Sequence, residues 1–346
     1  LKANTSEVES AENVLIPTPT GWKINTNSGV FNAENGVYIY MAIRRGPLAA
    51  PESATDVFDV TTWTSSGEPK FQTSFASDMA MNRNVNISYD MRIASRLTQG
   101  KFLKTSVTDV EASNSNFNFD YMNGFLASGG SSDFYSWQWK RAPSYFDVVA
   151  YTGNGVQGHN VSHNLGVAPD MMWVKQRSTS FINGDWQVYV RGITHLSVYG
   201  SDPDNFGDNP VVLVLNGTNT AQFSSSGVWD HTHPTDTYFR LGDTYHTNRS
   251  GDPYIAYLFA TVAGVSKVGS YTGNGGTQTI DCGFSNGCKL FIVKRTNATG
   301  DWFLWDSARG ISSGNDPFII LNDPDAVDNT TDSVDPDSSG IIVNEL

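Results

Sequence analysis

The residues best suited to bind a metal ion lie in an acidic tract near residue 335. Asp335, Asp337 and Ser339 alternate along the chain and Gly340 follows them, which matches the start of a calcium-binding loop. Such a loop needs a bidentate carboxylate at its twelfth position, and here that position is Leu346. We keep the three oxygen-bearing residues as calcium candidates, with a solvated turn as the favoured interpretation.

The two cysteines of the chain, Cys282 and Cys288, flank the sequence Gly-Phe-Ser-Asn-Gly. An Asn-Gly pair favours a tight turn, which would bring the two flanks together. The sequence is compatible with two states of these cysteines, a disulfide or a pair of buried free thiols. A disulfide would indicate an oxidising compartment, whereas two cysteines without a histidine partner do not make a zinc site.

Other catalytic and cofactor motifs are missing or incomplete. His231 and His233 could supply two metal ligands, but the spacing places no third, so a polar loop is favoured. No Gly-x-Ser-x-Gly nucleophile elbow occurs, and no Gly-Lys-Ser/Thr phosphate loop occurs. Paired carboxylates of a glycosidase need only meet in space, so glycan hydrolysis stays as a minor alternative. We predict a protein that is not an enzyme and has no cofactor, calcium at the acidic tract excepted.

Composition narrows the class of partner. The chain has 346 residues and a formal net charge of −13, and its densest basic runs are only pairs such as Arg44-Arg45, so nucleic acid is a poor partner. No apolar run approaches the roughly 20 residues that span a bilayer, so we expect no membrane insertion. Charged residues make up only 16%, and Ser, Thr, Asn and Gly take their place, as in short strands joined by many turns.

The chain repeats itself. Tyr-Thr-Gly-Asn-Gly occurs at 151–155 and again at 271–275, and similar hairpin sequences follow at 160–175 and 279–294. Internal similarity at a fixed period indicates an array of related units. Weaker similarities extend the pattern, among them Tyr89-Asp-Met-Arg-Ile, which we align with the segment that begins at Trp186.

Three segments are predicted to be the closing strands of successive units. They are 36–44, 134–139 and 254–260, each rich in aromatic and β-branched residues and the first two followed by a basic pair, a small residue and proline. We therefore predict the C-terminal half of a repeat at 1–47, a diverged repeat at 57–143, a full repeat at 144–264, and a repeat at 265–346 that is incomplete at its end.

Short strands with regular turn signals predict the fold of each unit. The strands are aromatic or β-branched, Gly-, Asn- and Pro-rich segments separate them, and no stretch shows convincing helical periodicity. This pattern is typical of sandwiches and barrels, and units near 100 residues suit a sandwich. The prediction is an all-β chain of tandem, jelly-roll-like β-sandwich repeats.

Several segments resemble one family. They are 38–47, 137–155 and 163–175, and together they are similar to a repeated, functionally uncharacterised domain of tail-fibre and other virion proteins of marine bacteriophages. The resemblance implies a structural or adhesive virion component and brings no catalytic residues.

We therefore expect a phage structural protein, located in the virion or outside the cell, that mediates host-surface adhesion. Its expected partners are other virion proteins and further copies of itself, with a host glycan or protein as a possible receptor. Two alternatives stay open. One is a cellular adhesin or a self-assembling extracellular filament protein, and the other is a tailspike-like polysaccharide depolymerase.

Overall fold

The computed structural model describes residues 15–18, 21–24, 32–38, 40–41, 48–98, 100–127, 129–178, 184–194, 197–198, 200, 207–223, 227–325 and 327–344. Nearly all regular structure in this part is antiparallel β-sheet, which confirms the predicted all-β, sandwich-type fold. A short helix, α2 (Tyr245–Asn248), lies in the second half of the chain. None of the helices described is long and apolar enough to cross a bilayer.

The first unit (57–143) contains a six-stranded sheet and a two-stranded one. The large sheet has the order β3-β10-β5-β6-β7-β8, and the small one pairs β4 with β9. Their bounds are β3 Phe58–Thr62, β4 Phe71–Gln72, β5 Met79–Asn84, β6 Arg92–Ser95, β7 Lys101–Lys104, β8 Ala112–Ser113, β9 Gly124–Phe125 and β10 Phe134–Trp139. Two 3-10 turns, η1 (Ala54–Asp56) and η2 (Arg96–Thr98), accompany them.

The middle unit (144–264) repeats this arrangement. Its large sheet has the order β11-β17-β13-β14-β15, and its small sheet pairs β12 with β16. The bounds are β11 Phe146–Thr152, β12 His159–Ser162, β13 Met171–Gln176, β14 Gln187–Val190, β15 Leu213–Val214, β16 Tyr238–Leu241 and β17 Pro253–Phe259. The predicted closing strands at 134–139 and 254–260 are thus β10 and β17, each in the interior of its sheet.

The last unit (265–346) has the orders β19-β20-β21 and β18-β23-β22. The bounds are β18 Gln278–Asp281, β19 Leu290–Lys294, β20 Trp302–Asp306, β21 Ile319–Ile320, β22 Val334–Asp337 and β23 Gly340–Val343. Strands β19, β20 and β21 correspond to β13, β14 and β15. Within the described residues, no strand corresponds to β11 or β17, so β19 is an edge strand.

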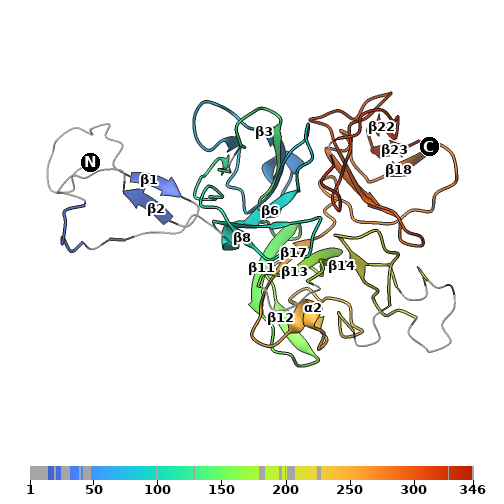
Figure 1. Cartoon of the computed structure of the whole chain (residues 1–346), viewed down its shortest axis with the longest axis horizontal. Helices are drawn as coiled ribbons and strands as arrows, with labels where there is room; N and C mark the ends of the chain where they lie inside the picture. The colour runs from blue at the N-terminus through green and yellow to red at the C-terminus, as the bar shows by residue number, and fades with distance from the viewer. Residues whose placement is uncertain are drawn as a thin grey trace.

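A separate hairpin precedes the three units. It pairs β1 (Leu15–Thr18) with β2 (Gly21–Ile24). Thr18 pairs with Gly21 across the turn, as Asp337 pairs with Gly340 in the β22–β23 hairpin. Figure 1 shows this hairpin at one end of the long axis of the molecule, with the last unit near the other end.

The strand predicted at 36–44 is not present in the described part of that segment. Residues 36–38 and 40–41 have no strand structure, and the remaining positions lie outside the described residues. A β-strand needs a neighbour for its backbone hydrogen bonds. β10 and β17 each have a neighbour on both sides, whereas none of the described strands pairs with the described residues of this segment.

Each large sheet has two buried faces, which explains why its strands read as apolar runs. In β13, Met172 and Val174 pack toward the small sheet of their own unit, while Trp173 packs into a core shared by all three units. Alternation along a strand sends neighbours to opposite faces. Met81 and Leu304 contribute to the same shared core from the first and last units.

The pairing register corrects one sequence alignment. Met79 pairs with Ser95, Met171 with Val190, and Leu290 with Asp306. Counting back from these pairs places Met91, and not Tyr89, at the position of Trp186 and Trp302. The alignment on aromatic residues was wrong by two positions because the first unit carries a methionine where the others carry tryptophan.

Candidate functional site

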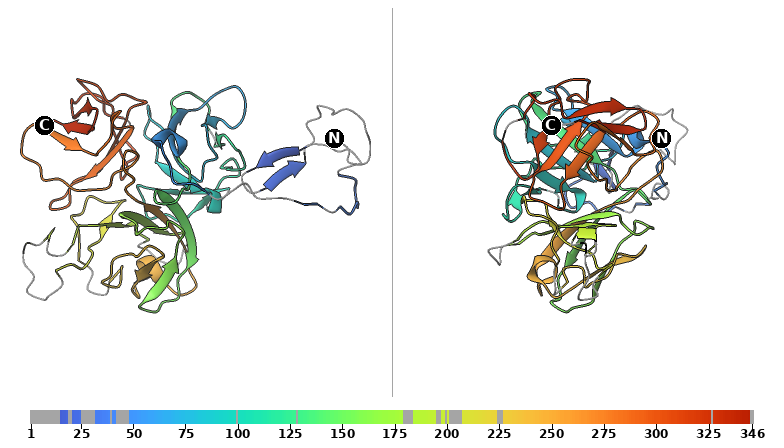
Figure 2. Two further views of the ribbon diagram at one scale, coloured as in Figure 1. Left: turned by 180° about the vertical axis from the view of Figure 1, so that it is seen from behind. Right: turned by 90° about the vertical axis from the view of Figure 1, so that its right-hand side faces the viewer.

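The three units contact one another through equivalent hydrogen bonds and form a closed ring. One backbone N–H of each unit donates to a carbonyl of the next. The bonds are Glu111 N to Arg177 O (3.1 Å), Ala221 N to Thr296 O (2.8 Å) and Val327 N to Val85 O (3.1 Å). The strand registers show that the three donors occupy equivalent positions in their units, and so do the three acceptors. The same interface therefore occurs three times. Figure 2 shows the three units packed around one another from two further sides.

A cation lies beside each of these bonds and donates to the neighbouring unit. Lys175 Nζ donates to Thr108 O at 2.9 Å, Lys294 Nζ to Thr218 O at 3.1 Å, and Arg83 Nη2 to Pro324 O at 3.1 Å. Burial lowers the pKa of Lys175 to about 8 and that of Arg83 to about 10, because the charged form loses its hydration. Burial also lowers the pKa of Lys294.

Tryptophan side chains complete two of the three interfaces. Trp186 Nε1 donates to Lys104 O at 2.8 Å, and Trp302 Nε1 donates to Val214 O at 2.9 Å. Met91 stands at the third equivalent position, and its side chain has no N–H group to donate. At the interface between the first and last units, Trp137 Nε1 instead donates to the buried Asp306 carboxylate at 3.1 Å.

The repeated Tyr-Thr-Gly-Asn-Gly loop has a defined binding role in the middle unit. The buried Asn248, at the end of α2, lies against it: its Oδ1 accepts from Asn154 N at 2.9 Å, and its Nδ2 donates to Val156 O and Gly242 O. Gly155 N donates to the Asn248 carbonyl at 2.8 Å. The loop therefore binds the segment that leads into the closing strand β17, and we call it the closing loop.

The glycines of the closing loop allow this segment to approach closely. A Cβ on Gly153 would lie 2.2 Å from the Arg249 carbonyl oxygen, and a Cβ on Gly155 would lie 3.1 Å from Ser250 Cβ. Gly155 also has a φ of 70°, which favours glycine. At Gly153 the close contact alone accounts for the absent side chain.

In the last unit the described residues include the same loop but no counterpart of the segment that it binds in the middle unit. Asn274 Oδ1 accepts from Gly276 N at 2.8 Å, as Asn154 Oδ1 accepts from Val156 N at 2.8 Å. A Cβ on Gly273 would meet no atom within 4 Å. A pocket of about 250 Å³ lies here, lined by the loop, Tyr271, Gln278 and the end of β23. The loop has thus formed its own turn, and the space beside it is open.

Strand β19, which lies next to this open space, is also more exposed than its counterpart β13. All five residues of β19 are only partly buried, whereas Met172–Gln176 of β13 are buried. Tyr151 stacks on Tyr254 of the closing strand with ring centroids 5.2 Å apart. The equivalent Tyr271 is 39% exposed. Both differences follow from the closing strand that covers the middle unit and is absent from the described part of the last unit.

Residues 32–38 have the backbone structure of 248–254. Gly36 N donates to Ala33 O at 3.0 Å, as Asp252 N donates to Arg249 O at 3.2 Å. Asn35 and Gly251, at equivalent positions, have φ values of 61° and 82°.

The tyrosine that ends each turn makes the same hydrogen bond. Ala33 N donates to the Tyr38 hydroxyl at 2.8 Å, and Arg249 N donates to the Tyr254 hydroxyl at 2.9 Å. Asn32 therefore stands at the position of Asn248.

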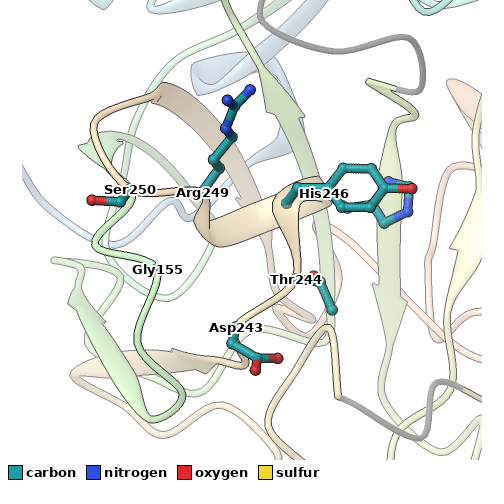
Figure 3. Close-up of a pocket in the computed structure, with 7 residues that line it drawn as sticks. Gly155, Asp243, Thr244, His246, Arg249 and Ser250 are labelled. Carbon is teal, nitrogen blue, oxygen red and sulfur yellow. The ribbon is translucent and has the colours of Figure 1, made fainter.

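A second pocket, of about 480 Å³, lies beside α2 (Figure 3). It is lined by Gly155, Asp243, Thr244, Tyr245, His246, Arg249 and Ser250. Asp243 is the one carboxylate among these residues, and a glycosidase mechanism needs two. The lining therefore does not provide the chemistry of the depolymerase alternative.

The calcium candidates lie on the β22–β23 hairpin. Asp337 Oδ1 accepts from the N–H and the hydroxyl of Ser339, at 2.8 and 2.7 Å. Asp335 Oδ2 accepts from Asn344 Nδ2 at 3.1 Å. Leu346 lies outside the described residues. The described residues include no group of three His, Cys, Asp or Glu that could hold a metal ion, and calcium at this hairpin stays a prediction.

Cys282 and Cys288 are free thiols in this structure. Burial raises the pKa of both, that of Cys288 to about 12. Disulfide formation between them stays a prediction. His233 is bound on both ring nitrogens, by the Tyr189 hydroxyl at 2.8 Å and the Asp208 carbonyl at 2.8 Å, which leaves it no nitrogen for a metal ion.

The sequence reasoning did not identify the closing loop as a binding site. Two signals were available: the loop sequence is identical in both copies, and Asn32 precedes Tyr38 by the same spacing as Asn248 precedes Tyr254. The first was used only as evidence of repetition.

The fold and its interfaces define a class of protein, namely an all-β chain built from repeated units. Within that class, the domain of unknown function DUF7483 matches residues 131–345, more than half of the chain, and the chain belongs to this family. No curated protein and no solved structure matches the chain.

Proposed function

We propose that the chain is a non-enzymatic structural component of a phage virion, in a tail fibre or a comparable appendage, and that it contributes to adhesion at the host surface. The resemblance of its repeated segments to marine phage virion proteins supports the phage assignment. The threefold repetition of one interface supports the structural role.

The observation that carries the proposal is the cation at each interface, which is buried in the case of Lys175 and Arg83 and partly buried in the case of Lys294. Lys175, Lys294 and Arg83 each bind a carbonyl of the neighbouring unit. A buried cation whose partner moves away loses its hydrogen bond without regaining water, so separation of the units is costly. An interface of this kind fixes the units relative to one another, as an appendage that transmits force requires.

Adhesion would come from many weak contacts. A repeated chain that assembles in several copies presents the same loops many times, and multiple attachment raises the overall affinity without a deep pocket. The pocket beside α2 in Figure 3 is lined by hydroxyl, imidazole and guanidinium groups, and each of these groups could make one weak contact with a host molecule.

The test is a competition assay with the purified chain. The protein should bind host cells and reduce adsorption of the phage, and antibodies against it should decorate the appendage of intact virions in electron micrographs. Absence of cell binding together with absence of virion labelling would refute the proposal. Release of reducing ends from host polysaccharide would support the depolymerase alternative instead.

A further inference from the structure

The interface between the first and last units differs from the other two in how the chain connects its sides. β10 of the first unit ends at Trp139 and β11 of the middle unit begins at Phe146, so a short connection joins these two units. The middle unit likewise continues directly into the last one. A short connection holds two surfaces at a high effective concentration, so they meet again soon after they separate. The first and last units are joined only through the whole middle unit, and noncovalent contacts alone keep their interface closed.

Charged side chains supply several of these contacts. The Asp306 carboxylate, which accepts from Trp137 Nε1 of the first unit, also accepts from Arg309 Nε at 2.6 Å. The Arg309 guanidinium lies over the Trp137 ring, 5.5 Å from its centroid. Lys289 Nζ of the last unit lies 2.6 Å from Asp59 Oδ1 of the first. We call these five residues the clasp.

The clasp is not a repeated feature of the units. The strand registers place Ser95 and Val190 at the position of Asp306, so only one of the three equivalent positions carries a carboxylate. Met91 stands where the other two interfaces have a tryptophan that donates to a carbonyl. The first–last interface thus lacks a hydrogen bond that the other two share and has a charged cluster of its own.

The arrangement of the units directs a pull along the molecule onto the clasp. Figure 1 shows the first and last units side by side along the long axis, with the middle unit below both, and the view from behind in Figure 2 agrees. Tension along this axis draws the first and last units apart. The middle unit, which is connected to both, then acts as the pivot.

We propose that the first–last interface opens before the other two interfaces and that the closed ring then becomes an open row of three folded units. The inference goes beyond the proposed function and rests on the structural role for its purpose. An appendage under tension would gain length by opening the clasp, and no unit would have to unfold.

The shared core explains why the ring closes again when tension is removed. Trp137, Met91 and Leu304 are buried in that core, and separation of the first and last units would expose part of it to water. Exposure of apolar surface is unfavourable in proportion to the area. The closed ring is therefore the stable state without load, and the open row is a minor state that tension favours.

Hydrogen exchange at increasing urea concentrations below the unfolding transition tests the order of opening. NMR follows the amides of Val327, Glu111 and Ala221, which report on the first–last, first–middle and middle–last interfaces, and amides in the interior of each large sheet report on unfolding of the units. We expect all of these amides to be protected without urea. As urea is added, Val327 should lose protection first, while the interior amides stay protected.

Two matched variants show whether the clasp sets this order. Trp137→Phe removes the indole donor to Asp306 and should speed exchange of Val327 about tenfold without a change at Glu111. Trp302→Phe removes the indole donor to Val214 O at the middle–last interface, and Val327 should still exchange before Ala221.

Two results would overturn the inference. One is loss of protection at all three interfaces together with the interior amides, and the other is exchange of Glu111 or Ala221 before Val327 in the intact chain. The urea series on the intact chain decides both, even where a variant does not fold. Host binding is scored separately, because its presence or absence concerns only the proposed function.

Discussion

Lys175 Nζ lies 2.9 Å from the carbonyl oxygen of Thr108 and joins the middle unit to the first. The same contact joins the last unit to the middle one through Lys294 and the first unit to the last through Arg83. Because the third contact returns to the unit from which the first began, the units form a closed ring. Further copies therefore cannot be added by repeating this interface, and assembly needs another surface.

The buried ammonium of Lys175 predicts a dependence of stability on pH. Its pKa falls from 10.5 to about 8 on folding, so between about pH 8 and 10.5 the unfolded chain binds more protons than the folded one. The free energy of unfolding therefore gains a contribution that rises with pH in this window. The penalty for burying the charge is complete below pH 8 and is relieved above pH 10.5, and it amounts to about 3 kcal/mol.

Lys175→Met isolates this contribution from the titration of other groups. Urea unfolding at pH 7.5 and pH 10 should show the wild-type chain gaining stability relative to the variant as the pH rises. Parallel pH profiles for the two proteins would show that the ammonium is not buried at the interface.

The two copies of the closing loop should respond differently to the same substitution. Gly153→Ala forces a Cβ to within 2.2 Å of the Arg249 carbonyl oxygen, and such overpacking costs about 1–3 kcal/mol. Gly273→Ala, whose Cβ meets no atom within 4 Å, should change the stability of the monomer by less than about 0.5 kcal/mol. Thermal melts compare the two, and equal shifts would contradict the description of the loop in the last unit as open.

Asn248→Ala should destabilise the middle unit. The change leaves the backbone groups of Asn154, Val156 and Gly242 without the amide that binds them, and each unsatisfied buried group costs about 1–3 kcal/mol. A small effect of Asn248→Ala on the melting temperature would mean that water replaces the amide and that the closing loop contributes little to binding.

The two cysteines should react with iodoacetamide at different rates. Only the thiolate reacts, and burial raises the pKa of Cys288 to about 12. Cys282 is less buried and should be labelled first, while both should react at similar rates in the denatured chain. Mass spectrometry of peptides measures the two rates, and a mass lower by two hydrogens with no labelling would establish the disulfide that the sequence left open.

Much of the architecture was predictable from repetition. The closing strands at 134–139 and 254–260 and the hairpins after the Tyr-Thr-Gly-Asn-Gly loops have side chains that the repeats share, and the structure contains them. The position of Met91 was not predictable in this way, because the alignment relied on aromatic residues and the first unit lacks one there.

The ring was not predictable from the sequence, for a physical reason. Its acceptors are backbone carbonyls of Thr108, Thr218 and Pro324, and any residue type supplies a carbonyl. The equivalence of Asn35 and Gly251 was also not visible in the sequence, because asparagine and glycine are different residue types that both tolerate a positive φ. Side-chain identity carries little information at such positions.

Hydrogen exchange of three backbone amides tests the closed ring most directly. The N–H groups of Glu111, Ala221 and Val327 each donate to a carbonyl of the neighbouring unit, and an amide inside a packed interface exchanges only when that interface opens. We predict strong protection of all three amides in the native chain. Exchange of any one of them at the rate of an unstructured peptide would contradict the closed ring.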